Sequence, residues 1–414
     1  MKLFRVLLSL AAGVGLLAGS CTKTEDPPRR IGQELPYNGA TKTLVQLLDS
    51  MPDATLYKAM YQRSDLPHYM DSLNNGNPTL PYTLFVPTDK ALTAAGYTKD
   101  VIASTPVAQL DTLVRYLALS GNYSVAPGVT AGTTCYPLMD EDPNMIRSIP
   151  DQPVNYSYVL GVGFEGNTLF LNGSKASSQA SPVAAVNGSI YRIDTLIQKP
   201  FYEMYQVVSS DTSLSLFLAG MRLNDSIYQE RSILGFPGYY VNYNDTAGLQ
   251  LASANRSGGA PFSIVLAPTN DAFRKAGLGS VDAIRAFVNQ SVVASPDYNY
   301  TYLQTNLDSI FQYHLLYFNG IIGLGYNSYT AAGTYVYTYD MLQNPALVQR
   351  VYTIPYSTDT YYLNYVTFGN KGGQVVVHRA DNPSARAATI VAPSDVTTLN
   401  GVLHRVDNLL LPTP

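Results

Sequence analysis

One short pattern occurs twice in this chain, and it limits the folds that the chain can adopt. Residues 82–96 read YTLFVPTDKALTAAG, and residues 262–277 read FSIVLAPTNDAFRKAG. Each copy begins with a continuous apolar run, which is typical of a strand buried on both faces. Pro-Thr-Asp/Asn follows, and its side-chain oxygens can cap the next helix before a glycine ends it. The sequence therefore predicts the same strand–helix unit at two places.

Two further segments repeat in the same order, so the repeat covers whole domains. LDTLVRYL at 110–117 has the apolar spacing of an amphipathic helix and returns as LDSIFQYH at 307–314. VNGSIYRIDTLI at 186–197 returns as LNGVLHRVDNLL at 399–410. Both closing segments start with an Asn-Gly turn and continue as an alternating strand, which predicts a hairpin. The offset between copies grows along the chain, because the second copy contains insertions.

These motifs together resemble the fasciclin (FAS1) domain. The shared features are strand–Pro-Thr-Asn–helix, a helix ending in Tyr-His, and Asn-Gly-x-x-His-x-Val-Asp near the end. The resemblance implies an α+β fold with two tandem fasciclin-like domains, each a small twisted β-wedge or sandwich flanked by several α-helices. Their expected bounds are 41–199 and 203–412. The first copy departs from the pattern, with Tyr116-Leu117 where the family has Tyr-His.

The N-terminus has the pattern of an export signal. Lys2 and Arg5 precede an apolar stretch that is too short to span a bilayer comfortably, and LLAGSC follows. This resembles a bacterial lipoprotein signal, which implies removal of residues 1–20 and lipid attachment at Cys21. Several acyl chains on one residue would give stable anchoring. The alternative is an ordinary signal peptide with a cysteine nearby by chance. Residues 21–40 contain adjacent prolines and mixed charges, and they are predicted to be a flexible tether.

Charge and motif content exclude several function classes. The net charge is −4 and no run of Lys or Arg occurs, which argues against a nucleic-acid partner. The motifs of zinc proteases, serine hydrolases and phosphate loops are absent, and the four histidines lack metal-ligand spacing. GVGFEG at 161–166 fits a dinucleotide-binding pattern, but a strand-like segment follows it, so a turn between strands is predicted. The acidic cluster at 140–142 lacks the spacing of a calcium loop. No catalytic residue, cofactor or metal ligand is therefore predicted, although distant carboxylates could still converge as in a hydrolase.

Tyrosine is the most over-used residue, and its clusters are the candidate contact sites. The chain has 33 tyrosines, no tryptophan and only 14% charged residues. The spacing of two in Tyr335, Tyr337 and Tyr339 predicts three rings on one face of a strand. Such a face suits stacking on sugar rings or on a protein. The alternative is that tyrosine covers a surface poor in charge, and that the Tyr-His pair is packed in the core. The candidate partner-contact residues are Tyr313, His314, Tyr335, Tyr337, Tyr339, Tyr361 and Tyr362.

The sequence thus predicts a lipid-anchored binding protein of the cell envelope. The fasciclin resemblance implies non-catalytic adhesion, with an extracellular protein or polysaccharide as partner. The lipoprotein resemblance implies membrane attachment through Cys21, with the outer membrane and a surface-exposed position as expectations. A glycan-binding accessory lipoprotein of an outer-membrane polysaccharide-uptake system is the alternative, in which the tyrosines would hold the sugar.

Overall fold

The computed structural model describes the chain from residue 39 onward, with gaps. The described residues are 39–74, 80–123, 133–149, 152–234, 245–251, 264–290, 305–316, 335–344, 351–353, 360–362 and 366–411. The chain divides into two units, Met1–Ala40 and Thr41–Pro414. All elements below belong to the second unit, and the predicted signal, Cys21 and most of the predicted tether lie outside the described residues. Within the described part, no helix has both the length and the apolar character needed to cross a bilayer.

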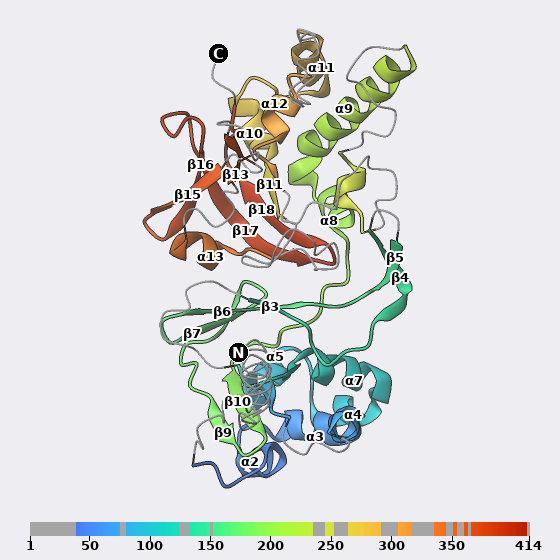
Figure 1. Ribbon diagram of the computed structural model, residues 1–414, viewed down its shortest axis with the longest axis vertical. Helices are drawn as coiled ribbons and strands as arrows, with labels where there is room; N and C mark the ends of the chain where they lie inside the picture. Colours follow the sequence, from blue (N-terminus) through green and yellow to red (C-terminus); the bar gives the residue numbers. More distant parts are fainter. Residues whose placement is uncertain are drawn as a thin grey trace, which may run out of the picture. The chain divides into compact units, whose positions relative to one another are not determined.

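The first half of the unit combines short helices with three small sheets (Figure 1). The helices are α2 (Leu44–Ser50), α3 (Thr55–Arg63), α4 (Leu66–Leu73), α5 (Asp89–Ala94), α6 (Lys99–Ser104) and α7 (Val107–Tyr116). The strands are β1 (Tyr82–Pro87), β2 (Ala118–Ser120), β3 (Thr133–Cys135), β4 (Asp142–Ile149), β5 (Gln152–Tyr156), β6 (Leu160–Glu165), β7 (Thr168–Leu171), β8 (Ser174–Ser177), β9 (Val183–Ala185) and β10 (Gly188–Ile193). The sheets have the strand orders β2-β1-β10-β9, β3-β6-β7-β8 and β4-β5.

The second half repeats this arrangement with a larger sheet. Its helices are α8 (Met204–Ser210), η1 (Thr212–Leu214), α9 (Ser215–Ile233), η2 (Ala247–Leu249), α10 (Asn270–Lys275), α11 (Val281–Asn289), α12 (Asp308–Phe311) and α13 (Thr338–Gln343). Its strands are β11 (Ile264–Pro268), β12 (Leu315–Leu316), β13 (Val351–Thr353), β14 (Thr360–Tyr362), β15 (Val366–Lys371), β16 (Gln374–Arg379), β17 (Ala388–Thr398) and β18 (Gly401–Val406). The orders are β12-β11-β18-β17-β16-β15 and β13-β14.

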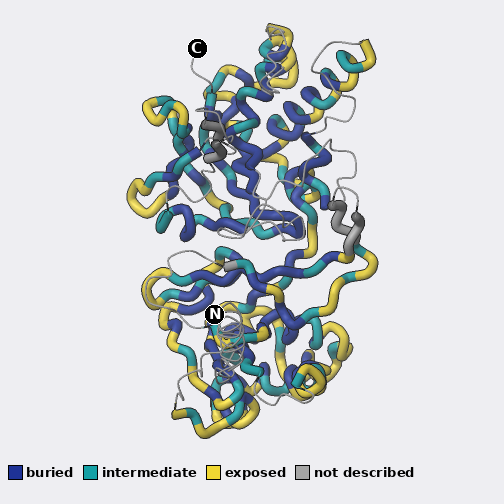
Figure 2. Tube along the Cα trace, viewed as in Figure 1, coloured by how far each residue is buried: buried dark blue, intermediate teal, exposed yellow. Residues whose placement is uncertain are grey.

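The same strand pairing occurs in both halves. β1 lies between antiparallel β2 and parallel β10, and β11 lies between antiparallel β12 and parallel β18. The hairpins β9–β10 and β17–β18 end the two copies, as the Asn-Gly turns predict. Every residue of β1 and β11 is buried, which explains their continuous apolar runs (Figure 2). The predicted α+β class is confirmed.

The repeated Pro-Thr-Asp/Asn motif ties two helices to each sheet. Thr88 caps α5 by accepting a hydrogen bond from the Ala91 amide at 3.2 Å, and Thr269 caps α10 in the same way. The next residue does not cap that helix, contrary to the sequence expectation. Asp89 instead accepts from the backbone amide of Leu56 in α3 at 2.7 Å, and Asn270 accepts from the amide of Leu216 in α9 at 2.9 Å. The motif therefore joins each strand to the helix before it and the helix after it.

A second set of polar contacts is repeated at the closing hairpins. The Asn187 side chain accepts from the Leu44 amide at 2.9 Å, and the Asn400 side chain accepts from the Met204 amide at the same distance. The bond from Asn187 holds the first turn of α2, the first helix of the first half. The bond from Asn400 holds the first turn of α8, the first helix of the second half. The guanidinium groups of Arg192 and Arg405 likewise pair with Asp53 and Asp211. The two halves thus share polar links as well as the apolar pattern.

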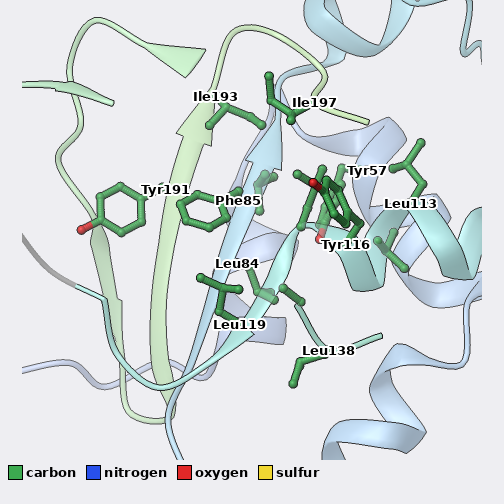
Figure 3. Packing of buried hydrophobic residues seen from close by; sticks show 14 of the residues in the cluster. Tyr57, Leu84, Phe85, Leu113, Tyr116, Leu119, Leu138, Tyr191, Ile193 and Ile197 are labelled. Atoms are coloured by element: carbon green, nitrogen blue, oxygen red, sulfur yellow. The ribbon is translucent and has the colours of Figure 1, made fainter. Parts of the chain in front are cut away.

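The core of the first half lies between β1, β10 and the helices α3 and α7 (Figure 3). The rings of Phe85 and Tyr191 stack with centroids 5.7 Å apart. Leu84, Tyr57 and Tyr116 are fully buried in the same cluster. Burial of apolar surface contributes about 25 cal/mol to the free energy of folding for each Å² removed from water. These large buried side chains are therefore major contributors to stability.

Two of these buried tyrosines differ in their hydroxyl groups. Among the described residues, the Tyr57 hydroxyl has no hydrogen-bond partner. The Tyr116 hydroxyl donates to the Val159 carbonyl at 2.8 Å and accepts from the Asn172 amide at 2.7 Å. A buried hydroxyl without a partner carries a desolvation cost of about 1–3 kcal/mol.

We therefore expect Tyr57→Phe to leave stability unchanged or to raise it by about 1 kcal/mol. Tyr116→Phe is the matched control, and it should lower stability by about 1–3 kcal/mol because it leaves Val159 and Asn172 without their partner. Urea unfolding of both variants measures the difference. Equal losses in the two variants would contradict the assignment.

Candidate functional site

His314 of the Tyr-His pair is a core residue. Its side chain is fully buried just after α12. Nε2 accepts a hydrogen bond from the Leu410 amide at 3.0 Å, so the proton must lie on Nδ1, which donates to the Leu266 carbonyl at 2.7 Å. Burial lowers the pKa of His314 to about 4. The neutral ring therefore links β11 to the C-terminal segment, and it is not available to a partner.

Tyr313 is also buried, and it supports an ion pair. Its hydroxyl donates to the Asp381 carboxylate at 3.0 Å, while the Arg379 guanidinium lies 4.7 Å from its ring centroid. Arg379 and Asp381 form a salt bridge at 2.5 Å. The hydrogen bond from Arg379 lowers the pKa of Asp381. Tyr313 thus packs under a charged pair and does not form a free contact surface.

The prediction of a tyrosine strand was wrong. Tyr335 and Tyr337 lie in an extended segment, but α13 begins at Thr338, so Tyr339 belongs to a helix. Asp395 fixes this change of direction by accepting hydrogen bonds from the Thr338 amide at 2.7 Å and from its hydroxyl at 2.5 Å. The rings of Tyr337 and Tyr339 still stack, with centroids 5.7 Å apart.

These three tyrosines are buried, so they do not form the exposed stacking face that the sequence suggested. Tyr337 is 0% exposed, and burial raises its pKa and that of Tyr339 well above the usual value. The Tyr335 hydroxyl donates to the Leu399 carbonyl at 2.9 Å. The Tyr339 ring stacks on Phe170 of β7, with centroids 4.7 Å apart. Tyrosines of the second half therefore pack against a hairpin of the first.

Glycines in that hairpin make room for the rings. The turn predicted at 161–166 is confirmed only at its end: residues 161–165 belong to strand β6, and Gly166, with φ +56°, lies between β6 and β7. A Cβ on Gly161 would lie 2.5 Å from the Tyr337 ring, and one on Gly163 would overlap the Tyr339 ring. We call Gly161 and Gly163 the glycine track. Their spacing of two on one strand face was a signal of close approach that the sequence analysis missed.

The remaining predicted contact residues are only partly described. Tyr361 and Tyr362 lie in β14, which pairs with β13, but their side chains lie outside what the structure describes. Cys21 lies outside the described residues altogether. The sites proposed at these positions stay predictions.

A buried acidic network was not predicted from the sequence. The Asn224 amide donates to Asp245 at 2.9 Å and to Asp308 at 2.8 Å, and the Tyr228 hydroxyl donates to Asp308 at 2.7 Å. Burial, followed by the charge of Asp245, raises the pKa of Asp308 to about 6 and that of Asp225 to about 7. These carboxyls favour folding while protonated, so their contribution falls as pH rises from about 4 to 7.

The described residues present little catalytic chemistry. No group of three His, Cys, Asp or Glu side chains in the described part is arranged to hold a metal ion. Burial raises the pKa of the Cys135 thiol to about 11, so the reactive thiolate is disfavoured at neutral pH. Asp140 of the acidic cluster pairs with Arg115 at 2.9 Å, and Asp142 accepts from the Tyr158 hydroxyl at 3.3 Å. These groups stabilise the fold.

Two surface grooves formed by described residues of the second half are candidate binding sites. The first has a volume of about 630 Å³ and lies along α8, α9 and α11, with Arg222 and Arg285 in its lining. The second has a volume of about 700 Å³ and includes Arg274 and Asp271, which pair with each other. Both volumes fall in the range of about 300–1,000 Å³ that is typical of small-molecule sites. Basic side chains outnumber acidic ones in the lining of the first groove, whereas the two are equal in number in the second. The first groove can therefore attract a charged ligand and is the stronger candidate.

Comparison with known proteins gives one family match. The family model of the Fasciclin domain matches residues 54–199. The chain is also similar to the solved FAS1 domain pair from the insect cell adhesion molecule fasciclin I, with 15% identity and a TM-score of 0.29, covering 86% of this chain and 96% of that one. A search of curated proteins finds no match. Residues 54–199 of this chain are therefore similar to the Fasciclin domain.

Proposed function

We propose that the chain is a non-catalytic adhesion or binding protein of the cell surface. The observation that carries this proposal is the match of residues 54–199 to the Fasciclin domain, because such domains are associated with adhesion and binding. The repeated topology of the second half supports a tandem pair of binding domains. Cys135, Asp140 and Asp142 are used in structural contacts, which favours a non-catalytic role for these groups.

The buried tyrosines change where a partner would bind. Tyr335, Tyr337 and Tyr339 are packed inside the fold, so the proposed partner would contact a different surface of the chain. Glycan binding, in an accessory protein of polysaccharide uptake, is the second candidate function. Its support is the first groove, which offers both hydroxyl and guanidinium groups to a ligand.

Binding by the full chain carrying Cys21→Ala tests the function. We expect saturable binding to whole cells, to an extracellular protein or to a polysaccharide in a surface-plasmon-resonance panel. Binding to polysaccharide alone would favour the second candidate. The absence of binding throughout the panel and to cells would contradict the proposal.

We also propose that Cys21 carries the lipid anchor. The support is the apolar stretch before LLAGSC, which resembles a lipoprotein signal. We expect Cys21→Ala to move the protein from the membrane fraction to the soluble fraction, because the acyl chains supply the membrane affinity. Cys135→Ala is the control, since its thiol is buried, and it should stay with the membrane. Unchanged fractionation of Cys21→Ala would contradict lipid attachment.

A further inference from the structure

The groove along α9 and α11 has a distinctive set of polar groups. Arg222 of α9 and Arg285 of α11 line it from two helices, and neither forms an ion pair among the described residues. The groove also contains Asp211, but that carboxylate is already paired with Arg405, and the Arg405 Nε lies 2.7 Å from it. The groove is therefore locally cationic, although the whole chain has a net charge of −4.

One of the two guanidinium groups is held in place. The Tyr205 hydroxyl accepts a hydrogen bond from Arg222 at 2.8 Å, and the guanidinium carbon lies 6.0 Å from the Tyr205 ring centroid. A guanidinium restrained in this way loses less entropy when it binds a carboxylate or sulfate. Such a group binds these anions through two parallel N–H···O bonds.

The hydroxyl groups in the groove complement the arginines. Ser209 donates its proton to the Gln206 carbonyl at 3.1 Å, and Ser226 donates to the Leu223 carbonyl at 2.8 Å. Each serine oxygen therefore keeps lone pairs that can accept hydrogen bonds from a ligand. Apolar side chains in the lining, among them Leu218 and Val281, can contact the C–H face of a sugar ring.

We propose that this groove binds a sugar that carries an anionic group, a carboxylate or a sulfate. The ligand must supply an anion for Arg222 and Arg285, hydroxyl donors for Ser209 and Ser226, and a weakly polar face. An acidic sugar of an extracellular polysaccharide has all three features, and a volume of about 630 Å³ accommodates it. This inference rests on the proposed binding function and names its ligand class.

Isothermal titration of the full chain carrying Cys21→Ala tests the inference. The probes are a tri-galacturonate, a sulfated tetrasaccharide and a neutral cellotetraose. We expect at least one anionic probe to bind, more weakly as salt rises, and the neutral probe to bind at least about tenfold more weakly. The anionic probe that binds more tightly identifies the preferred group. Equal affinity for the neutral and anionic probes would overturn the inference.

Arginine variants link the binding to the groove. Arg222→Gln and Arg285→Gln should each lower the affinity for the anionic probe about tenfold. Arg222→Lys keeps the charge but loses the paired N–H donors of the guanidinium, so its affinity should lie between those of the wild type and Arg222→Gln. Arg386→Gln removes an exposed charge of the same half outside the groove and should have no effect. Unchanged affinity in both groove variants would overturn the site. If the chain binds cells or proteins but neither anionic probe, the inference fails and the proposed function stands.

Discussion

Gly163→Val is expected to lower the free energy of unfolding by about 3 kcal/mol or more, because the new side chain would overlap a buried ring. A Cβ at position 163 would overlap the Tyr339 ring, which is buried and stacked on Phe170. The overlap would separate the β6–β7 hairpin from α13. Urea unfolding followed by near-ultraviolet circular dichroism reports both the stability and the packing of the tyrosines.

The control for this prediction lies in the same hairpin. Gly166 has φ +56°, and no atom lies within 4 Å of the position that a Cβ would take there. Asparagine tolerates this backbone conformation, so Gly166→Asn should change stability by less than about 1 kcal/mol. A double variant tests the mechanism, since Tyr339→Ala removes the ring that the new valine side chain would overlap. Gly163→Val should therefore cost less in the Tyr339→Ala background than alone. An equal cost in both backgrounds would contradict the glycine track as the cause.

His314→Ala is expected to lower the free energy of unfolding by about 4 kcal/mol at pH 7.5, because it leaves a cavity and two unpaired backbone groups. The groups that lose their partner are the Leu266 carbonyl and the Leu410 amide, both buried. His68→Ala is the control, because His68 is exposed on α4 and its loss should cost less than about 0.5 kcal/mol. A His314→Ala variant with unchanged stability and lost binding would instead identify a contact residue.

The cost of His314→Ala should also depend on pH. The folded state lowers the pKa of His314 from 6.5 to about 4, so the unfolded chain binds its proton more readily. The stability that His314 contributes is therefore complete above pH 6.5 and is lost as pH falls through 4. The difference between wild type and variant should shrink by about 3 kcal/mol over that range. The raised pKa values of Asp225 and Asp308 make stability fall as pH rises, which is opposite to the effect of His314. Both carboxyls are present in the wild type and in the variant, so their effects largely cancel in the difference between the two proteins.

The parts of the fold that follow from local pattern were predictable. Continuous apolar runs identified β1 and β11, and the threonines after them cap α5 and α10 as expected. The Asn-Gly turns located the closing hairpins. The hydrogen bonds that Asp89 and Asn270 accept from the preceding helices were not predictable, because those helices reach the motif only after folding.

The tyrosine segment shows why the candidate site was harder to predict. A spacing of two is the same in a buried extended segment and in an exposed strand, so Tyr335 and Tyr337 could not be assigned to either. Asp395, 57 residues away from Thr338, helps to start the helix that contains Tyr339. The first groove could not be predicted either, because it forms only when the helices pack. That packing brings Arg222 of α9 and Arg285 of α11 to one site from distant positions in the sequence.

The central claim is that the tyrosines at 335–339 hold the fold together and do not meet a partner. Nitration of the native chain with tetranitromethane, followed by peptide mass spectrometry, tests this directly. Tyr136 and Tyr202 are 53% and 61% exposed and serve as internal standards. We predict that both standards react while Tyr337 and Tyr339 stay unmodified until the chain is unfolded. Nitration of Tyr337 and Tyr339 at the rate of Tyr202 would contradict the claim and restore the exposed tyrosine face.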